Sequence, residues 1–318
     1  MRTWPRRLAL IGMLGLASAC GGPQEVETPP DQQTVEPPSA PQPEPAADID
    51  WAAVEAGLGR AGATQAGGEY RFNMPRADLA VTVDRVEIRP ALSLGSWVAF
   101  MPVGAGEAVL MGDMVLTDEE YNAVIARLHE GGIGQTAVHK HLPEHSPDLW
   151  WTHVHGHGDP VELAQTVREA VALTGTPPAP SAPAAPPPLD LDTAQIRQIL
   201  GRAGNANGGV YGVSFGRAET IRAAGIDVPP AMGMATVMNF QPTGGGRAVV
   251  NGDFSMLASE VDSVVRTLRE NGIEVVSIHN HTSDEEPRLI FTHFWGNDDA
   301  LTLARGLRAA LDHTNVAR

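Results

Sequence analysis

Cysteine, aromatic residues and positive charge are scarce in this sequence of 318 residues. Cys20 is the single cysteine, so the chain cannot form an internal disulfide bond and cannot hold a metal through several thiolates. Basic residues number 22 against 38 acidic ones, which gives a net charge of −16 at pH 7. A surface of that charge repels phosphate backbones, and we therefore exclude nucleic acid from the expected partners.

The first twenty residues are typical of a bacterial lipoprotein signal. Arg2, Arg6 and Arg7 form a basic start, and the apolar run LALIGMLGLA leads through small residues to Cys20. This run is too short for a membrane span, which needs about 20 apolar residues. We expect cleavage before Cys20 and lipidation of the new N-terminus; an ordinary signal peptide with a cysteine by chance is the alternative. Cleavage removes three arginines and no acid, which takes the charge from −16 to −19.

The expected location is the cell envelope, with the membrane as a partner through the lipid on Cys20. Gly21, and not Asp, follows the cysteine, which favours the outer membrane in a bacterium with two membranes. Residues 21–48 are rich in Pro, Glu and Gln and predict a disordered tether. A second proline-rich stretch at 176–189 predicts a linker. The two stretches separate two blocks, 49–175 after the tether and 190–318 after the linker, each of a size to hold one core.

The two blocks are copies of one another. LGRAG occurs at Leu58–Gly62 and again at Leu200–Gly204, and Gly-Asp occurs at Gly112–Asp113 and at Gly252–Asp253. Histidines at 139, 141 and 153 recur with the same spacing at 279, 281 and 293. The chain is therefore a tandem duplication, and we expect two homologous domains that favour docking on each other over separate beads.

Each block predicts the same order of elements. A helix opens it, at 51–61 or 193–203, and ends at a glycine. Short strands follow, among them one at 80–88 or 220–226, and form an antiparallel meander, in which TGGGR at Thr243–Arg247 is expected to be a hairpin turn. The meander precedes a helix that begins at the capping box Thr117–Glu120 in the first copy. Two strands and a last helix, at 160–173 or 299–311, complete the block. The predicted class is α+β, with a mostly antiparallel sheet and about three helices in each domain.

Histidines are the most informative residues of both copies. His279 and His281 alternate along one predicted strand and so point to the same face, and His293 lies on the expected neighbouring strand. Three imidazoles with an open fourth position form a catalytic zinc site in many enzymes, so zinc or another divalent metal is the expected cofactor, if there is one. The first copy repeats the set in a degenerate form, with His139, His141 and His153.

Carboxylates near these histidines are candidates for supporting roles. Glu285 and Glu286, in the loop between the two strands, are the candidate general bases. Four further acids could orient the imidazoles: Asp253 and Glu260 in the second copy, and Asp113 and Glu120 in the first.

A histidine cluster also has a structural interpretation. Paired histidines at a strand end can hydrogen-bond to the backbone or to an acid and so fix a loop, and they can bind a substrate without a metal. Four aromatic residues flank the histidine strands and are expected in the core, with the wall of a ligand cleft as the alternative: Trp150, Trp151, Phe294 and Trp295. Ser277 shares the face of His279 and is a weak candidate nucleophile.

The run from His279 to Leu311 resembles the LppY/LpqO-type lipoprotein family. It carries, in order, H-N-H, a short loop, E-P-R, hydrophobic residues, H-F-W, G-x-D and a helix reading L-A-x-x-L-R-x-A-L. The Gly-Asp-Phe at Gly252–Phe254 also fits. The resemblance implies two such units, secretion and lipidation, and it implies no reaction. In the first copy Lys140 replaces Asn280 and the E-P-R is lost, so we expect the working site in the second copy.

The sequence thus predicts an envelope lipoprotein with a histidine-rich ligand or metal-binding pocket, and a binding or accessory role is preferred. A zinc-dependent hydrolase that uses His279, His281 and His293 is the first alternative. A purely structural envelope protein is the second. The expected partner is a small molecule or an envelope component.

Overall fold

The computed structural model describes residues 49–179 and 188–317. The predicted signal with Cys20, the tether 21–48 and the middle of the predicted linker lie outside the described residues. None of the helices in these ranges is long and apolar enough to cross a membrane.

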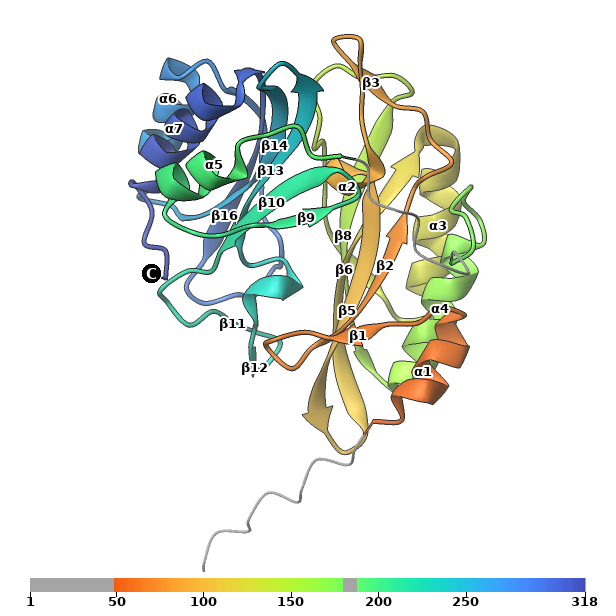
Figure 1. The fold of residues 1–318 in the computed structure, drawn as a ribbon. Coiled ribbons are helices and arrows are strands. Elements are labelled where there is room, and N and C mark those ends of the chain that lie inside the picture. Colours follow the sequence, from red (N-terminus) through yellow and green to blue (C-terminus); the bar gives the residue numbers. More distant parts are fainter. Residues whose placement is uncertain (1–48, 180–187, 318) are drawn as a thin grey trace, which may run out of the picture. The chain divides into compact units, whose positions relative to one another are not determined.

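The first repeat contains three long helices and a six-stranded sheet (Figure 1). Its helices are α1 (Trp51–Leu58), α3 (Asp118–Glu130), α4 (Pro160–Val171) and the short α2 (Pro90–Ser93). Its strands are β1 (Ala63–Thr64), β2 (Tyr70–Pro75), β3 (Thr82–Val83), β4 (Val86–Glu87), β5 (Gly95–Gly104), β6 (Glu107–Thr117), β7 (Gly134–His139) and β8 (Leu149–Gly158).

The second repeat has the same elements in the same order. Its helices are α5 (Thr193–Leu200), α6 (Val261–Glu270), α7 (Ala300–Leu311) and the 3-10 turn η1 (Pro230–Met232). Its strands are β9 (Asn205–Asn207), β10 (Val210–Phe215), β11 (Arg222–Ala223), β12 (Ile226–Asp227), β13 (Thr236–Gly244), β14 (Arg247–Leu257), β15 (Glu274–His279) and β16 (Leu289–Asp299).

The two main sheets are entirely antiparallel and have matching strand orders. The order is β1-β2-β5-β6-β8-β7 in the first repeat and β9-β10-β13-β14-β16-β15 in the second. This confirms the predicted α+β class and the two homologous domains. The predicted hairpin turn in TGGGR is also confirmed, because Gly244 pairs with Arg247 between β13 and β14.

Each sheet buries one face under its own three helices. Phe72, Phe100 and Leu110 meet Leu163 and Val167 of α4 in the core of the first repeat. The second repeat builds its core from the equivalent positions, with α5, α6 and α7 over the sheet. Burial of about 25 cal/mol per Å² of apolar surface makes these two cores the main source of stability in a chain without disulfides.

The opposite faces of the sheets pack against the other repeat. The arm that carries β3, β4 and α2 sends Val83, Ile88 and Leu92 into a cluster with Val249 and Trp295 of the second repeat. In return, the arm that carries β11, β12 and η1 packs on β5 and β6 of the first repeat; its members in that cluster are Ile221, Ala223, Val228 and Met232. Both repeats belong to one compact unit, and the reciprocal arms hold them together.

These arms differ in detail from the prediction of one strand at 80–88 and one at 220–226. Each arm is instead a tight two-stranded hairpin with residues of positive φ at its tip, Asp84 and Arg85 in the first and Ala224 and Gly225 in the second. Three of these four residues are not glycine, so the turn carried no clear sequence signal.

Candidate functional site

Strand pairing places an aspartate beside a histidine in each repeat. Asp113 of β6 lies directly opposite His153 of β8, and Asp253 of β14 lies directly opposite His293 of β16. The Gly-Asp pair found twice in the sequence is therefore the cross-strand neighbour of the third histidine of each copy. Both strand pairs direct these side chains toward the sheet face that meets the other repeat, where Asp113, His153 and His293 are buried.

A bulge in the edge strand brings the other two histidines of each copy toward that point. The register of β7 against β8 shifts between Gln135 and Ala137, and β15 shifts at the equivalent place against β16. Bulges bend a strand and re-aim its side chains. After the bulge Ala137 pairs with His153, so His139 lies diagonally across from it and the two rings are 4.5 Å apart.

The six predicted histidines converge at the boundary between the repeats, and we call them the histidine cluster: His139, His141, His153, His279, His281 and His293. They form three stacked pairs, and each pair joins the two repeats. The ring centroids are 3.8 Å apart for His139 and His279, 3.7 Å for His141 and His293, and 3.6 Å for His153 and His281. The three pairs follow an approximate two-fold relation, because the second copy repeats the first.

Ring nitrogens within the cluster lie close enough to share an ion. The Nε2 atoms of His139 and His141 are 3.0 Å apart. Two imidazole nitrogens on one tetrahedral ion at about 2.0–2.1 Å would lie about 3.3 Å apart.

Three groups have ligand atoms within 4.8 Å of one another, and two of them draw on both repeats: His139, His141 and His293; His139, His153 and His279; and Asp253, His279 and His293. In the described residues the predicted set of His279, His281 and His293 is not among them.

Many polar atoms of the cluster have no hydrogen-bond partner among the described residues. They comprise six buried ring nitrogens, from His139, His153, His279 and His293, and one carboxylate oxygen each of Asp113 and Asp253. Buried polar atoms are nearly always paired in folded proteins, so an unpaired group of this size calls for an ion, water or ligand.

Burial keeps the imidazoles neutral, which is the form that binds metals. The pKa of His281 falls to about 3, chiefly through burial, with Arg71 nearby adding to the effect. Burial, and then the neighbouring histidines, lower the pKa of His139 and His153 well below 6.5. The same holds for the other three members of the cluster. A neutral imidazole offers a lone pair to a cation.

The two aspartates touch the cluster directly. Asp113 lies 3.3 Å from Nε2 of His141 and 3.8 Å from Nδ1 of His153, and Asp253 lies 3.8 Å from Nε2 of His293. Burial raises the pKa of both carboxyl groups well above 3.8, and for Asp113 the nearby Asp253 adds to the shift. A bound cation would lower the pKa of both carboxyl groups again and so keep them ionised.

Four hydrogen bonds between the repeats hold the ends of β7 and β15, where the paired histidines His139/His141 and His279/His281 lie. Thr136 donates to the His281 carbonyl at 2.7 Å, and the Asn280 amide donates to the Thr136 carbonyl at 3.0 Å. Ser277 donates to the Lys140 carbonyl at 2.7 Å, so the candidate nucleophile is a bridging residue. Asn251 donates to the carbonyl of His141 at 2.6 Å.

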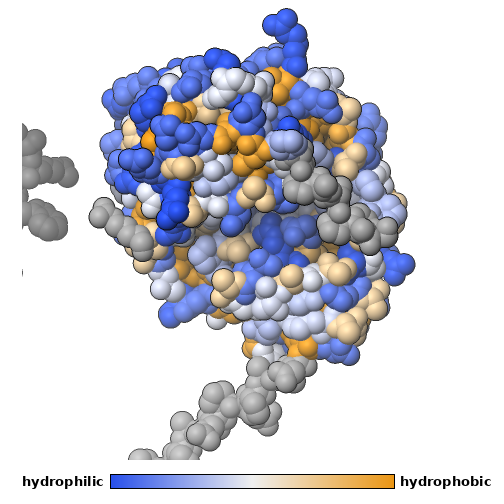
Figure 2. Space-filling view, in the orientation of Figure 1, coloured by the Kyte–Doolittle hydropathy of each residue, from blue (hydrophilic) through white to orange (hydrophobic). Residues whose placement is uncertain are grey.

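A cavity of about 860 Å³ opens between the repeats and reaches the cluster. His141, His153, His281 and His293 line it, together with Asp113 and Asp253. His139 and His279 are not among its lining residues. Figure 2 shows a hollow with hydrophilic side chains between the two halves of this face. The cavity lies within the range of about 300–1,000 Å³ that small-molecule sites occupy.

Glu285 and Glu286, the candidate general bases in the loop after β15, lie away from the cavity. Glu285 is buried, accepts a hydrogen bond from the Leu289 amide at 3.2 Å and also binds Thr282. In the first copy His145 stands at this place and accepts from the Leu149 amide. Glu286 is exposed and pairs through its backbone with Arg222. Neither acid lines the cavity.

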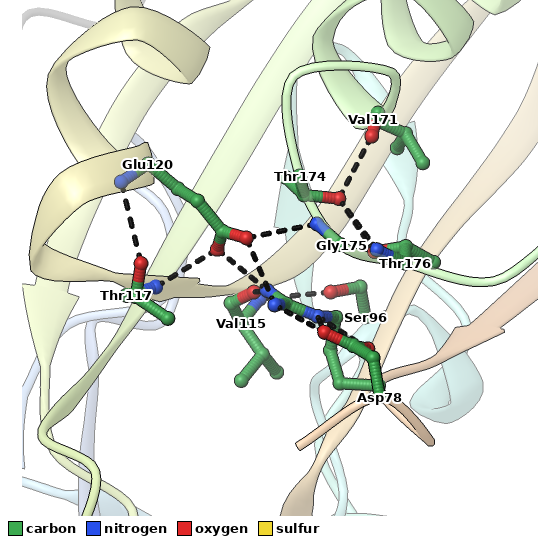
Figure 3. Close-up of polar contacts among 10 residues, drawn as sticks. Asp78, Ser96, Val115, Thr117, Glu120, Val171, Thr174, Gly175 and Thr176 are labelled. Atoms are coloured by element: carbon green, nitrogen blue, oxygen red, sulfur yellow. Dashed lines mark hydrogen bonds and ion pairs between the residues drawn. The ribbon is translucent and has the colours of Figure 1, made fainter.

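Glu120 and Glu260 are held by buried arginines. Glu120 accepts from Arg76 at 2.7 and 2.9 Å. It also accepts from the backbone of Thr117 and Gly175, as Figure 3 shows. Glu260 accepts from Arg217 at 2.7 and 3.0 Å. Both ion pairs tie the start of a helix to the preceding sheet. The sequence carried a signal for these arginines, because R-A-D at 76–78 recurs as R-A-E at 217–219.

The tryptophans that flank the histidines, and a further histidine of the first repeat, do not line the cavity. Trp151 and Trp295 are buried in the apolar cluster between the repeats, as core positions. His157 is exposed and pairs with Glu107 on the hairpin that joins β5 and β6. Sequence reasoning missed Arg71 and Trp97, which line the cavity on the first-repeat side.

Comparisons with known proteins agree with the duplication and assign no activity. The family described as "Domain of Unknown Function (DUF1259)" matches twice, at residues 52–173 and 194–313. No curated protein matches the chain. Among solved structures, the trimeric bacterial microcompartment shell protein PduB aligns over 80% of this chain and 89% of that one, with 14% identity and a TM-score of 0.21. A likeness at that score does not bear on the fold or the function.

Proposed function

The chain belongs to the family of the Domain of Unknown Function (DUF1259), and we propose that it is a binding protein for a divalent transition-metal ion held in the histidine cluster. Zinc is the first candidate, because imidazole and carboxylate donors suit it and the chain offers no second thiol. In this proposal both repeats supply ligands to one centre.

The observation that carries the proposal is the set of six buried ring nitrogens that have no hydrogen-bond partner in residues 49–179 and 188–317. A purely structural cluster would satisfy its nitrogens with backbone carbonyls or acids, as His293 does once, through Nδ1 and the Gly252 carbonyl at 2.9 Å. Each unsatisfied buried group costs about 1–3 kcal/mol, and a whole domain is stable by only about 5–15 kcal/mol. A bound ion would remove that cost at several nitrogens at once.

The test is the metal content of the purified full-length chain by mass spectrometry. We expect close to a whole number of zinc or other divalent ions per chain, lost in a His139→Ala/His279→Ala variant. His157→Ala, an exposed histidine in the same repeat, is the matched control and should keep the metal. A chain that carries no metal and takes up none at micromolar zinc would overturn the proposal.

A metal-dependent hydrolase is the second candidate, and the cavity favours it. Four histidines and both aspartates face a space that a small substrate could enter. In this version Asp113 or Asp253 is the general base, because the cavity does not reach Glu285 or Glu286. Zinc-dependent turnover of p-nitrophenyl acetate that disappears in Asp113→Asn/Asp253→Asn would support it. Equal turnover in that double variant would rule out this role for the aspartates.

The proposed setting is the bacterial envelope, with a lipid on Cys20, as the LppY/LpqO-type resemblance of His279–Leu311 implies. The basic start, the short apolar run and the cysteine support it. Mass spectrometry of the mature N-terminus should find an acylated Cys20, and Cys20→Ser should release the protein from the membrane fraction. An unmodified N-terminus upstream of Cys20 would contradict this.

A further inference from the structure

The cavity between the repeats is not symmetric, although the histidine cluster nearly is. Trp97 pairs with Asp113 in the first repeat, and the equivalent partner of Asp253 in the second is Val237. In β2 the residue after Tyr70 is Arg71, whereas in β10 the residue after Tyr211 is Gly212. One corner of the cavity therefore carries a cation on an aromatic ring, and the related corner carries neither.

Arg71 is held firmly in this corner. Its Nη1 donates to the Ala231 carbonyl of the second repeat at 2.7 Å, and its Nε donates to Asn73 at 3.1 Å. The guanidinium carbon lies 3.9 Å above the ring of Trp97. Within the described residues Nη2 has no hydrogen-bond partner. Burial lowers the pKa of Arg71 to about 10, so the side chain still carries its charge at neutral pH.

The same corner borders the histidine cluster. The ring of Trp97 lies 6.4 Å from that of His281. Gly233 follows the η1 turn with φ of +92°, and a Cβ at this position would stand 2.2 Å from the His281 ring. The backbone there thus approaches the imidazole as closely as glycine allows, and Arg71 binds the preceding turn. Arg71 is the only lysine or arginine among the described residues that line the cavity.

We propose that this corner binds the carboxylate of a small organic acid with a flat or apolar body. One carboxylate oxygen accepts from Nη2 of Arg71, and the other points to the ion in the histidine cluster. The body lies along Trp97 and the apolar lining that Ala91, Leu92 and Val237 provide. The second contact rests on the proposed metal function; the first does not.

A carboxylate fits this donor set better than a phosphate does. Nε and Nη1 each donate once to the protein, so Nη2 is the guanidinium nitrogen that keeps both of its N–H groups free for an oxygen of a planar carboxylate. The two oxygens of a carboxylate match Nη2 of Arg71 and the proposed metal ion. A stacked arginine and tryptophan also recognise planar groups, and cation–π contact contributes about 0.5–2 kcal/mol.

The test is calorimetric titration of the full-length chain with benzoate, in zinc-loaded and in chelator-treated form. Benzamide, the neutral analogue, and inorganic phosphate are the comparison probes. We expect benzoate to bind at least tenfold more tightly than either of them. Arg71→Gln should lower benzoate affinity at least tenfold. Trp97→Val, which installs the residue of the second repeat, should lower it several-fold.

Arg202→Gln is the matched control, because Arg202 also donates to two carbonyls and lies 5.1 Å from the Phe215 ring, outside the cavity lining. It should bind benzoate as the unaltered chain does. Zinc content is measured on every variant. If the purified chain carries no metal but binds benzoate, and Arg71→Gln loses that binding, this site is supported and the metal proposal is refuted. In a chain that carries metal, this site would be refuted and the metal kept by any of three outcomes. They are no benzoate binding, equal benzoate affinity in Arg71→Gln, and tighter binding of phosphate than of benzoate.

Discussion

Six neutral histidines at one boundary should make the metal-free protein sensitive to acid. Burial sets the pKa of every member of the histidine cluster below the value of 6.5 that an unfolded chain shows. Below pH 6.5 the unfolded chain therefore binds more protons than the folded one. These groups therefore leave the free energy of unfolding unchanged above about pH 7 and lower it as the pH falls from 6.5 toward the lower pKa values of the folded chain.

The two aspartates act in the opposite direction. Burial raises the pKa of Asp113 and Asp253, so the folded chain keeps protons that the unfolded chain releases above about pH 4. Around pH 5 the unfolded chain has gained up to six protons on the cluster and the folded chain up to two on the aspartates. The net difference of about four protons lowers the free energy of unfolding by about 5 kcal/mol per pH unit. Arg71, the neighbouring cation, stays charged throughout this range.

The assay is urea unfolding with a chelator present, at steps of half a pH unit from 7.5 to 5. We expect the midpoint to fall steeply below pH 6.5, with a slope equivalent to about four protons. His139→Leu/His279→Leu removes two titrating groups and should reduce the slope to about two protons, whereas His157→Ala should leave it unchanged. A slope below one proton, or an unchanged slope in the double variant, would refute the reasoning. Glu219, whose pKa Arg217 holds at about 2, titrates below this window.

Two further substitutions test the surroundings of the cluster. Glu120→Ala leaves the buried Arg76 with Asp78 as its remaining acid and should lower the free energy of unfolding by about 3 kcal/mol, measured in urea, without changing the metal content. Gly233→Ala places a methyl group against His281 at a backbone conformation that disfavours side chains, and should cost about 1–3 kcal/mol and weaken zinc binding in a competition titration. Full zinc affinity in Gly233→Ala would show that this contact does not shape the centre.

Much of the fold follows from local patterns in the sequence. The capping box predicted at Thr117–Glu120 is present, with both reciprocal hydrogen bonds, because its residues are three positions apart and need no distant partner. The prediction that His279 and His281 lie on one strand was only half right, because β15 ends at His279 and His281 lies in the bend that follows. Duplication repeated the order of the main strands and helices in both copies, and so that order could be predicted, whereas the two-stranded arms and the short elements α2 and η1 could not.

The identity of each histidine's neighbour could not be predicted in this way. The nearest ring to His153 is His281, and the nearest to His141 is His293, each in the other repeat. Those contacts depend on how two sheets dock, which the apolar arms decide through many weak contacts spread along the chain. Arg71 carried no motif at all, since its importance comes from the Trp97 ring beneath it and the turn of the second repeat beside it.

If the proposed metal lies at the boundary between the repeats, the expectation of one working copy and one degenerate copy takes a different form. A site at the boundary uses both copies together, so loss of E-P-R from the first does not remove that copy's histidines from the centre. The two copies share the cluster residues and differ at the cavity wall, where Arg71 and Trp97 face Gly212 and Val237. In the proposed site, divergence after duplication would set which ligand the cavity admits, while both copies have kept the three histidines that each supplies to the cluster.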